Sequence, residues 1–339
     1  MATIINARQK ELIALVNTQK VYNTYTPYTK MFKEVNAPIL SGRTDLLLED
    51  LVNTNYEAKT FPRNSSATIL QKQSHMRLSL RPPMLGHQMT VDTLSSLEKG
   101  AGEPIVIIDG QAVNGTDYEV EDKVNQIKKT IVNGLESMAS EVFVTSKITN
   151  LNINFDLNGD STKGDLTVTP ADGETVMAGI VKKVLDYQKT NKIIPSVSIG
   201  INAFNQLTNE IDSAAGKLSL GDYKVNKVTG ANEEYFEVTV EKMAITMRLL
   251  SLAKEYEGSD INTDDLIILH HGSTIGVGYA ILGVPDSARK TTIPVRSEFV
   301  AFEGDYNANN LAGSINVHSA PLPFIMDNTL LWRYNLVIA

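Results

Sequence analysis

The chain has 339 residues, of which 42% are apolar, and its 31 basic and 39 acidic residues give a formal net charge of −8. A chain of this length can bury a sizeable core, which we expect to be divided between two lobes. It contains no cysteine, which excludes disulfides, thiolate catalysis and cysteine-ligated zinc. The acidic balance and the lack of a clustered basic patch disfavour binding to nucleic acid by neutralising phosphates.

The amino terminus lacks the basic start, apolar stretch and small-residue cleavage site of a signal peptide. No apolar run approaches the ~18 residues that a membrane span requires. We therefore expect a soluble protein that is made in the cytoplasm.

The first 44 residues predict an arm outside the main core. Residues 3–22 are expected to form an amphipathic helix, whose apolar side chains are Ile5, Leu12, Ile13, Leu15 and Val16. An aromatic, extended stretch follows, with Tyr22, Tyr25, Pro27, Tyr28, Met31 and Phe32. The arm has too little sequence to form a core of its own. Two interpretations stay open, in which it packs on its own domain or lies along a neighbouring subunit.

The next segment predicts a long two-stranded loop. Residues 43–52 indicate a short strand or helix turn, and residues 53–73 are rich in Asn, Ser, Thr, Lys and Gln. Apolar and polar side chains then alternate over residues 76–80, with the period of a half-buried strand. Since an isolated hairpin is marginal in water, we expect this loop to lie on another surface.

The strongest periodic signal covers residues 119–145 and predicts a long helix. Its apolar residues recur in steps of three and four and are Val120, Val124, Ile127, Ile131, Leu135, Met138 and Val142. Thr116 and Glu119 form a capping box at its start, and Gly134 opposes it at a cost of about 1 kcal/mol. We interpret this segment as a spine laid across a sheet.

Shorter elements surround this spine in the sequence. Before it, Gln88–Gly100 predicts a helix, and Ile105–Ile108 predicts a strand that ends in a turn at Asp109 and Gly110. After it, helices are predicted around 176–185, with a cap near Thr169 and Pro170, and over 203–214. Residues 217–232 predict a polar connection. Strands are predicted in 150–157, 195–201, 236–250 (two), 266–269, 279–284, 299–302, 315–317 and the tail 330–339.

The histidines predict no reactive centre. His270 and His271 are adjacent on a predicted strand and should point to opposite faces, so they cannot easily bind one metal ion. His75, His87 and His318 are isolated in the sequence.

Two further motifs also fail. Asp156, Asn158 and Asp160 have calcium-loop spacing, but Ser161 stands where the glycine is needed and Thr167 where the glutamate is needed, so we predict a hairpin tip. The glycines at 272, 276 and 278 match no phosphate-binding pattern, and we expect them to permit close strand contact. We therefore assign no catalytic, cofactor-binding or metal-binding residue.

At this point five segments, in order, resemble one known family. They are ARQKELIALVNTQKVYNTYTPYTKMF, GHQMTVDTL, IKKTIVNGLESMASEVFVTSK, DDLIILHHGSTIGVGYAILGVPD and HSAPLPFIMDN, and together they span most of the chain. The chain resembles the major capsid proteins of tailed bacteriophages, specifically the lambda-type branch (the capsid protein E family).

The resemblance implies an α+β Hong Kong 97-type capsid fold with no cofactor and no metal. The implied organisation is an N-terminal arm (1–44), an E-loop (45–80), a peripheral domain (81–150) with the spine helix at 117–147, a mainly axial domain (151–313) and a return to the peripheral domain (314–339). In this fold the arm and the E-loop reach onto neighbouring subunits. Because the chain begins directly with the arm, we expect any scaffolding protein to be separate. We predict no covalent crosslink from Lys59 or Lys72.

The resemblance therefore predicts a structural protein and not an enzyme. It would form hexamers and pentamers of an icosahedral head, in a virion assembled in the host cytoplasm, around double-stranded DNA that it does not read. Implied partners are a separate scaffolding protein, a portal and a protease, with a decoration protein left open. The alternatives are an encapsulin-like nanocompartment shell and an α/β enzyme with a dispersed site.

Overall fold

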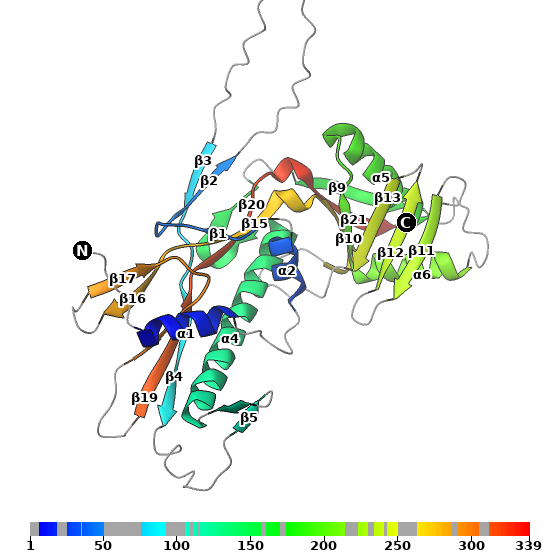
Figure 1. Cartoon of the computed structure of the whole chain (residues 1–339). Coiled ribbons are helices and arrows are strands. Elements are labelled where there is room, and N and C mark those ends of the chain that lie inside the picture. The colour runs from blue at the N-terminus through cyan, green and yellow to red at the C-terminus, as the bar shows by residue number, and fades with distance from the viewer. Residues whose placement is uncertain are drawn as a thin grey trace, which may run out of the picture.

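The computed structural model describes most of the chain as a mixture of helices and sheets (Figure 1). The described residues are 7–18, 26–34, 36–50, 76–92, 106–108, 111–113, 115–156, 161–169, 174–213, 223–229, 234–240, 243–249, 263–286, 291–304 and 312–339. The predicted loop over 53–73 and the turn at Asp109 and Gly110 lie outside these residues.

Helix α4 (Gly115–Thr145) is the spine, as predicted. It has 31 residues, which corresponds to roughly 46 Å at ~1.5 Å per residue. The predicted apolar stripe is buried along most of the helix, with Val124 and Val142 fully inaccessible. The helix begins and ends two residues before the predicted bounds of 117 and 147. The side chains of the predicted capping box lie outside the described set.

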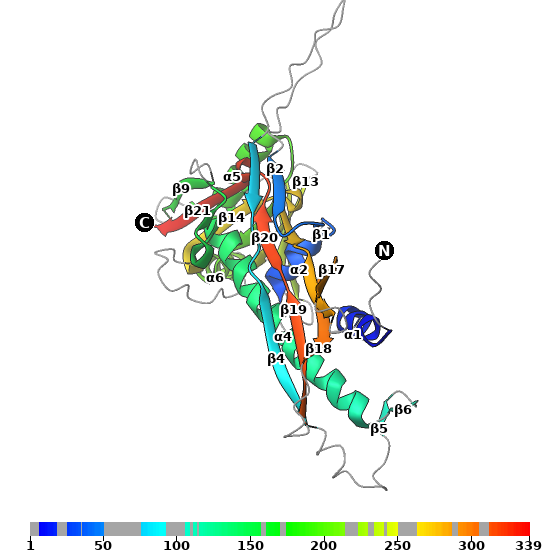
Figure 2. The same cartoon turned by 90° about the vertical axis from the view of Figure 1, so that its left-hand side faces the viewer.

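A three-stranded sheet runs along α4 (Figure 2). Its strands, in spatial order, are β18 (Val300–Glu303), β19 (Ala312–Ser319) and β4 (Leu85–Asp92). The predicted helix over Gln88–Gly100 is wrong in its first five residues, because β4 pairs with β19 along its whole length. This pairing overrides the local sequence preference.

A second small sheet crosses the carboxyl-terminal half of α4. It contains β1 (Ile39–Leu40), β15 (Ile275–Tyr279) and β20 (Pro321–Ile325). Hairpins extend from this region, formed by β2 (Leu46–Asp50) with β3 (Met76–Leu80) and by β16 (Leu282–Asp286) with β17 (Thr291–Val295). Two shorter pairs flank α4 and consist of β5 (Val106–Ile108) with β6 (Gln111–Val113) and of β7 (Lys147–Ile148) with β8 (Ile153–Asn154).

The second lobe is built on a seven-stranded mixed sheet, on the right in Figure 1. Its order is β11 (Tyr223–Thr229), β12 (Glu234–Val240), β13 (Met243–Leu249), β10 (Ser196–Ile199), β14 (Leu266–His270), β21 (Leu331–Ile338) and β9 (Thr162–Val168). The predicted polar connection over 217–232 is wrong over 223–229, where β11 pairs fully with β12, and its remaining residues lie outside the described set. Its polar character is that of an edge strand, whose Lys224 and Lys227 are exposed.

Two helices cover one face of this sheet. Helices α5 (Val176–Asn191) and α6 (Ile201–Ser213) share one apolar cluster with the strands. The N-cap of α5 is Thr175, whose side chain accepts from the Ala178 amide, so the predicted cap near Thr169 and Pro170 is wrong. The opposite face, at β14 and β21, packs against the end of α4 through Ile268 and Leu331.

The N-terminal arm contains two helices that pack on the chain's own body. Helix α1 (Ala7–Thr18) confirms the core of the predicted first helix, whereas α2 (Pro27–Glu34) replaces much of the predicted extended stretch. Leu12 and Val16 of α1 and Tyr28 and Phe32 of α2 are buried. The described part of the arm therefore follows the interpretation in which it packs on its own domain. None of the helices that the structure describes is long and apolar enough to span a membrane.

Candidate assembly surfaces

The spine holds α2 by the amino end of that helix. Both oxygens of the Glu136 carboxylate accept backbone hydrogen bonds, from Tyr28 N at 2.9 Å and from Thr29 N at 2.7 Å. These amides belong to the first turn of α2, where the helix leaves its N–H groups without internal partners. A carboxylate at this position also matches the positive end of the helix dipole. Glu136 therefore caps a helix that lies more than a hundred residues away in the sequence.

Aromatic packing also holds α2 against the spine. The ring of Phe143, on α4, lies 5.9 Å from the ring of Tyr28 and 6.5 Å from that of Phe32, measured between centroids. At the other end of α2, Lys33 Nζ lies 2.5 Å from Glu298 Oε2. Both side chains of this ion pair are partly exposed, so it contributes little stability by itself.

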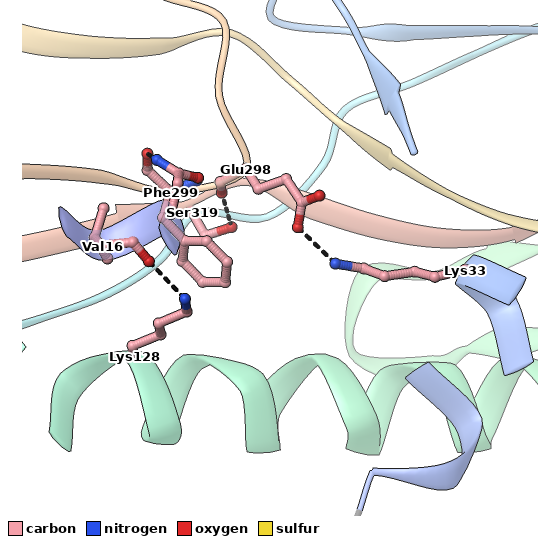
Figure 3. A network of polar contacts seen from close by, with 7 residues as sticks. Val16, Lys33, Lys128, Glu298, Phe299 and Ser319 are labelled. Atoms are coloured by element: carbon pink, nitrogen blue, oxygen red, sulfur yellow. Dashed lines mark hydrogen bonds and ion pairs between the residues drawn. The ribbon is translucent and has the colours of Figure 1, made fainter. Parts of the chain in front are cut away.

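The spine holds α1 by the opposite, carbonyl end of that helix. The buried Lys128 of α4 donates from Nζ to Val16 O at 2.5 Å, and the same nitrogen lies 5.0 Å from the centre of the Phe299 ring (Figure 3). A cation suits the negative end of a helix dipole and the face of an aromatic ring. Burial lowers the pKa of Lys128, and the nearby Glu298 carboxylate opposes this shift.

The side chain of Asn17 adds a second polar contact to α1. Its Nδ2 donates to Phe299 O at 3.0 Å, and its Oδ1 accepts from Phe299 N at 3.3 Å. The amide group thus pairs with the backbone just before β18, much as another strand would. Leu12 and Val16 lie beneath these polar contacts in one cluster with α4 and β18.

Glu298 lies between the sites where α1 and α2 pack, and it links α2 to the sheet beside the spine. Its carboxylate pairs with Lys33, and its backbone oxygen accepts from Ser319 Oγ at 2.6 Å (Figure 3). Burial raises the pKa of the nearby Tyr279, and the Glu298 carboxylate raises it further. Glu298 therefore contacts α2 and the last residue of β19, and it precedes Phe299, which contacts α1.

The base of the β2–β3 hairpin is fixed to the body by a close contact. Leu46 is buried, and a Cβ at Gly278 of β15 would lie 2.5 Å from its Cδ1 atom. Only glycine leaves room for this approach. Across the hairpin, Ser79 Oγ donates to Asp45 Oδ2 at 3.0 Å. The direction in which the hairpin leaves the body is therefore set by contacts at its base.

The candidate metal and histidine sites can be traced in the part of the chain that the structure describes. No group of three or more His, Asp or Glu side chains there is arranged to hold a metal ion. His270 is buried in β14, while His271 begins a short 3₁₀ turn (Gly272–Thr274), so the two diverge as predicted. His87 and His318 lie on β4 and β19, and His75 falls outside the described residues.

The two rejected motifs have structural explanations. The Asp156 carboxylate accepts from the backbone and hydroxyl groups of Ser161, whereas Asn158 and Asp160 lie outside the described residues. Gly276 and Gly278 are buried within β15, where the ring of Phe324 and the side chain of Leu46 leave no space for a Cβ. Close strand contact, as predicted, accounts for both glycines.

Sequence reasoning missed the charged residues that hold the arm. Lys128 and Glu136 interrupt no pattern on α4, and their partners are backbone atoms of other elements. Since nearly every residue offers the same backbone N–H and carbonyl groups, the sequence does not reveal which of them a side chain will bind. The only available signal was a lysine within one step of the apolar stripe, beside Ile127.

No protein-family model matches the chain, and no curated protein sequence matches it. Solved structures do match. One is the inferred capsid protein of a prophage from E. coli CFT073, with 14% identity, a TM-score of 0.53 and coverage of 99% of this chain and 100% of that chain. Others are the SrpI encapsulin complex of Synechococcus elongatus PCC 7942 (9% identity, TM-score 0.47, coverage 98% and 96%) and Mycobacterium phage Adephagia (9%, 0.47, 99% and 99%).

The prophage protein exceeds a TM-score of 0.5 over the whole of both chains. At this identity the likeness concerns the fold. The chain therefore has the α+β fold of that capsid protein, which is the Hong Kong 97-type fold expected from the sequence.

Proposed function

We propose that this chain is the structural major capsid protein of a tailed bacteriophage or prophage, of the lambda-type branch. It assembles through noncovalent contacts into hexamers and pentamers of an icosahedral head that encloses double-stranded DNA. The observation that carries the proposal is the fold shared, over the full length, with a protein described as a prophage capsid protein.

The proposed organisation keeps the domains expected from the sequence. The arm is 1–44, the E-loop 45–80, the peripheral domain 81–150, the axial domain mainly 151–313, and 314–339 returns to the peripheral domain. The association of α4 with β4 and β19 supports the peripheral domain. Several strand pairings cross these bounds, among them β18 with β19, β15 with β20 and β21 with β14.

The two outlying segments then have different roles. Helices α1 and α2 are seated on the chain's own spine, so we assign them to bracing that helix. The hairpin has its described contacts at its base, and we assign its polar segment to contact with a neighbouring subunit. Rings of five and six subunits use head-to-tail interfaces, which suits the described strands β2 and β3, since they extend from the body of the chain (Figure 1).

The proposal extends to the surroundings of the chain. The capsid protein that we propose is a component of the virion and not an enzyme, and it uses no cofactor or metal. A separate scaffolding protein, a portal and a protease act with it during assembly.

Deleting Asn55–Gln73 tests the role of the hairpin. The matched control keeps the length of this segment and shuffles the order of its residues, so that the distance between β2 and β3 is unchanged. We expect the wild type to form closed shells in electron micrographs and both variants to remain as folded, unassembled subunits with native circular dichroism. Normal shells from either variant would overturn the role of the hairpin.

The cargo separates this proposal from an encapsulin-like compartment. Particles purified from cells that also make the portal and the DNA-packaging proteins should contain nuclease-protected double-stranded DNA. Particles that instead enclose a single host enzyme would contradict the phage assignment.

A further inference from the structure

A buried arginine joins the seven-stranded sheet to the end of the spine. Arg333 lies on β21 and is 5% exposed. Its sequence neighbours Trp332 and Tyr334 belong to the cluster under α5 and α6. Because successive side chains of a strand alternate between faces, Arg333 projects from the other face, toward α4.

The guanidinium binds the last turn of α4. Its Nη2 donates to Phe143 O at 2.8 Å and to Ser146 Oγ at 2.8 Å, and its Nε donates to Phe143 O at 3.2 Å. The last carbonyls of a helix have no partners within the helix, and a cation favours that end of the dipole. Arg333 is therefore a C-terminal cap of the spine that comes from another lobe, at a sequence separation of 190 residues from Phe143.

A third segment meets the same side chain. Arg333 Nη1 donates to Ser161 Oγ at 2.5 Å, and the Ser161 hydroxyl donates in turn to the Asp156 carboxylate. Burial lowers the pKa of Arg333 to about 10, and Asp156 counteracts the shift, so the guanidinium stays charged at neutral pH. The planar group can bind the end of α4 and Ser161 at once because its five N–H donors point in fixed directions.

The backbone is shaped around this contact. Ser146 follows α4 in the left-handed region, with φ of 57°, and its amide donates to Val142 O at 2.8 Å. The ladder between β21 and β9 shifts register between Arg333 and Asn335. On β9 this irregularity contains Gly164, whose φ is +88°.

We propose that Arg333 is a positioning residue that fixes the angle between the spine helix and the seven-stranded sheet, and thereby the curvature of the assembled shell. Only the link to shell curvature rests on the proposed function. In a ring or shell the same interface repeats around the particle, so a small spread in the angle within each subunit becomes a spread in particle size. A cap with three fixed acceptors restricts that angle more than apolar packing alone does.

The chain's lack of cysteine allows the angle to be measured directly. Lys129→Cys on α4 and Lys182→Cys on α5, both exposed positions, would carry spin labels for a pulsed electron resonance distance. In the labelled wild type we expect one narrow distance distribution. In Arg333→Lys, which keeps a charge but loses the planar fork, we expect the width to at least double.

A second variant and a control make the test specific. Ser146→Gly removes one acceptor while glycine suits the left-handed backbone, so it should broaden the distribution without unfolding the chain. Arg248→Lys is the matched control, because Arg248 is exposed on β13 of the same sheet and lies over the Tyr235 ring. It should leave the distribution unchanged.

The outcomes separate the two parts of the inference. A narrow distribution in both Arg333→Lys and Ser146→Gly would overturn the positioning role. Broad distributions together with shells of uniform diameter, measured by electron microscopy, would overturn the link to curvature. If the two variants gave broad distance distributions but the wild type never assembled, the positioning role would be supported and the proposed function would be contradicted.

Discussion

The sheet lobe and the arm junction are held together in different ways. The lobe has one wide apolar cluster, in which α5 and α6 meet side chains from most strands of the sheet. The arm helices instead bury a few apolar side chains each and are fastened at their ends by Lys128, Glu136 and Asn17. Apolar contact is non-directional and roughly proportional to area, whereas a helix cap depends on one geometry.

This difference indicates how each region should respond to damage. Loss of a core side chain should weaken the lobe as a unit, because neighbouring contacts are shared. Loss of a cap should open one helix locally and leave the lobe intact. The following experiments, from the largest expected effect to the smallest, test that distinction.

Truncating the core of the lobe should have the largest effect. Phe236 is fully buried, with its ring centre 4.8 Å from that of Phe204. We expect Phe236→Ala to lower the free energy of unfolding by about 3–5 kcal/mol, through lost burial and a cavity. Chemical denaturation would measure this. Glu237→Ala, at the exposed neighbouring position, should change stability by about 0.5 kcal/mol or less, and equal losses in the two variants would contradict the account of the core.

Acid should weaken the junction between the lobe and the spine. Burial lowers the pKa of His270 from 6.5 to about 4. Between these values the unfolded chain binds a proton that the folded chain excludes, so stability falls as the pH falls, by about 1.4 kcal/mol per pH unit.

The comparison with His270→Gln isolates this effect. The stability of the wild type relative to the variant should decrease by about 2 kcal/mol from pH 6.5 to about pH 5. Denaturant unfolding at several pH values measures it. Parallel pH curves for the two proteins would show that His270 does not titrate in this way. Any residual slope in the variant would include His318, whose pKa burial also lowers.

Removing the cap of α2 should have a smaller and local effect. We expect Glu136→Ala to cost about 1 kcal/mol, as for other lost N-caps. Amide hydrogen exchange should accelerate at Tyr28 and Thr29, whose N–H groups lose their acceptor. Lys129→Ala, at an exposed position on the same helix, serves as the control. Unchanged exchange at both amides in Glu136→Ala would refute the capping role.

Replacing the buried lysine should have the smallest effect on overall stability. Lys128→Met keeps an unbranched side chain of similar length. It loses the hydrogen bond to Val16 O, which destabilises the fold, but it also removes a charge that is costly to bury. These two contributions to the unfolding free energy should nearly cancel. We expect the unfolding free energy to stay within about 0.5 kcal/mol, while amide exchange in α1 becomes faster. Faster exchange throughout the seven-stranded sheet would show instead that the arm and the lobe open together.

Much of the fold followed from periodicity. The stripe on α4 reflects a face that is buried by the whole domain, so the sequence records it. The errors at β4 and β11 have a common cause, since both are edge strands of their sheets, and their regularity comes from one paired partner rather than from two buried faces. Sequence alone could not locate Lys128, Glu136 or Arg333, because backbone atoms are their main partners.

Electron microscopy of the purified full-length chain tests the central claim most directly. Self-assembly predicts rings of five and six subunits or closed shells of repeated subunits. A population of dispersed single subunits, folded and stable at every concentration and salt tested, would contradict the assignment of this chain to a shell.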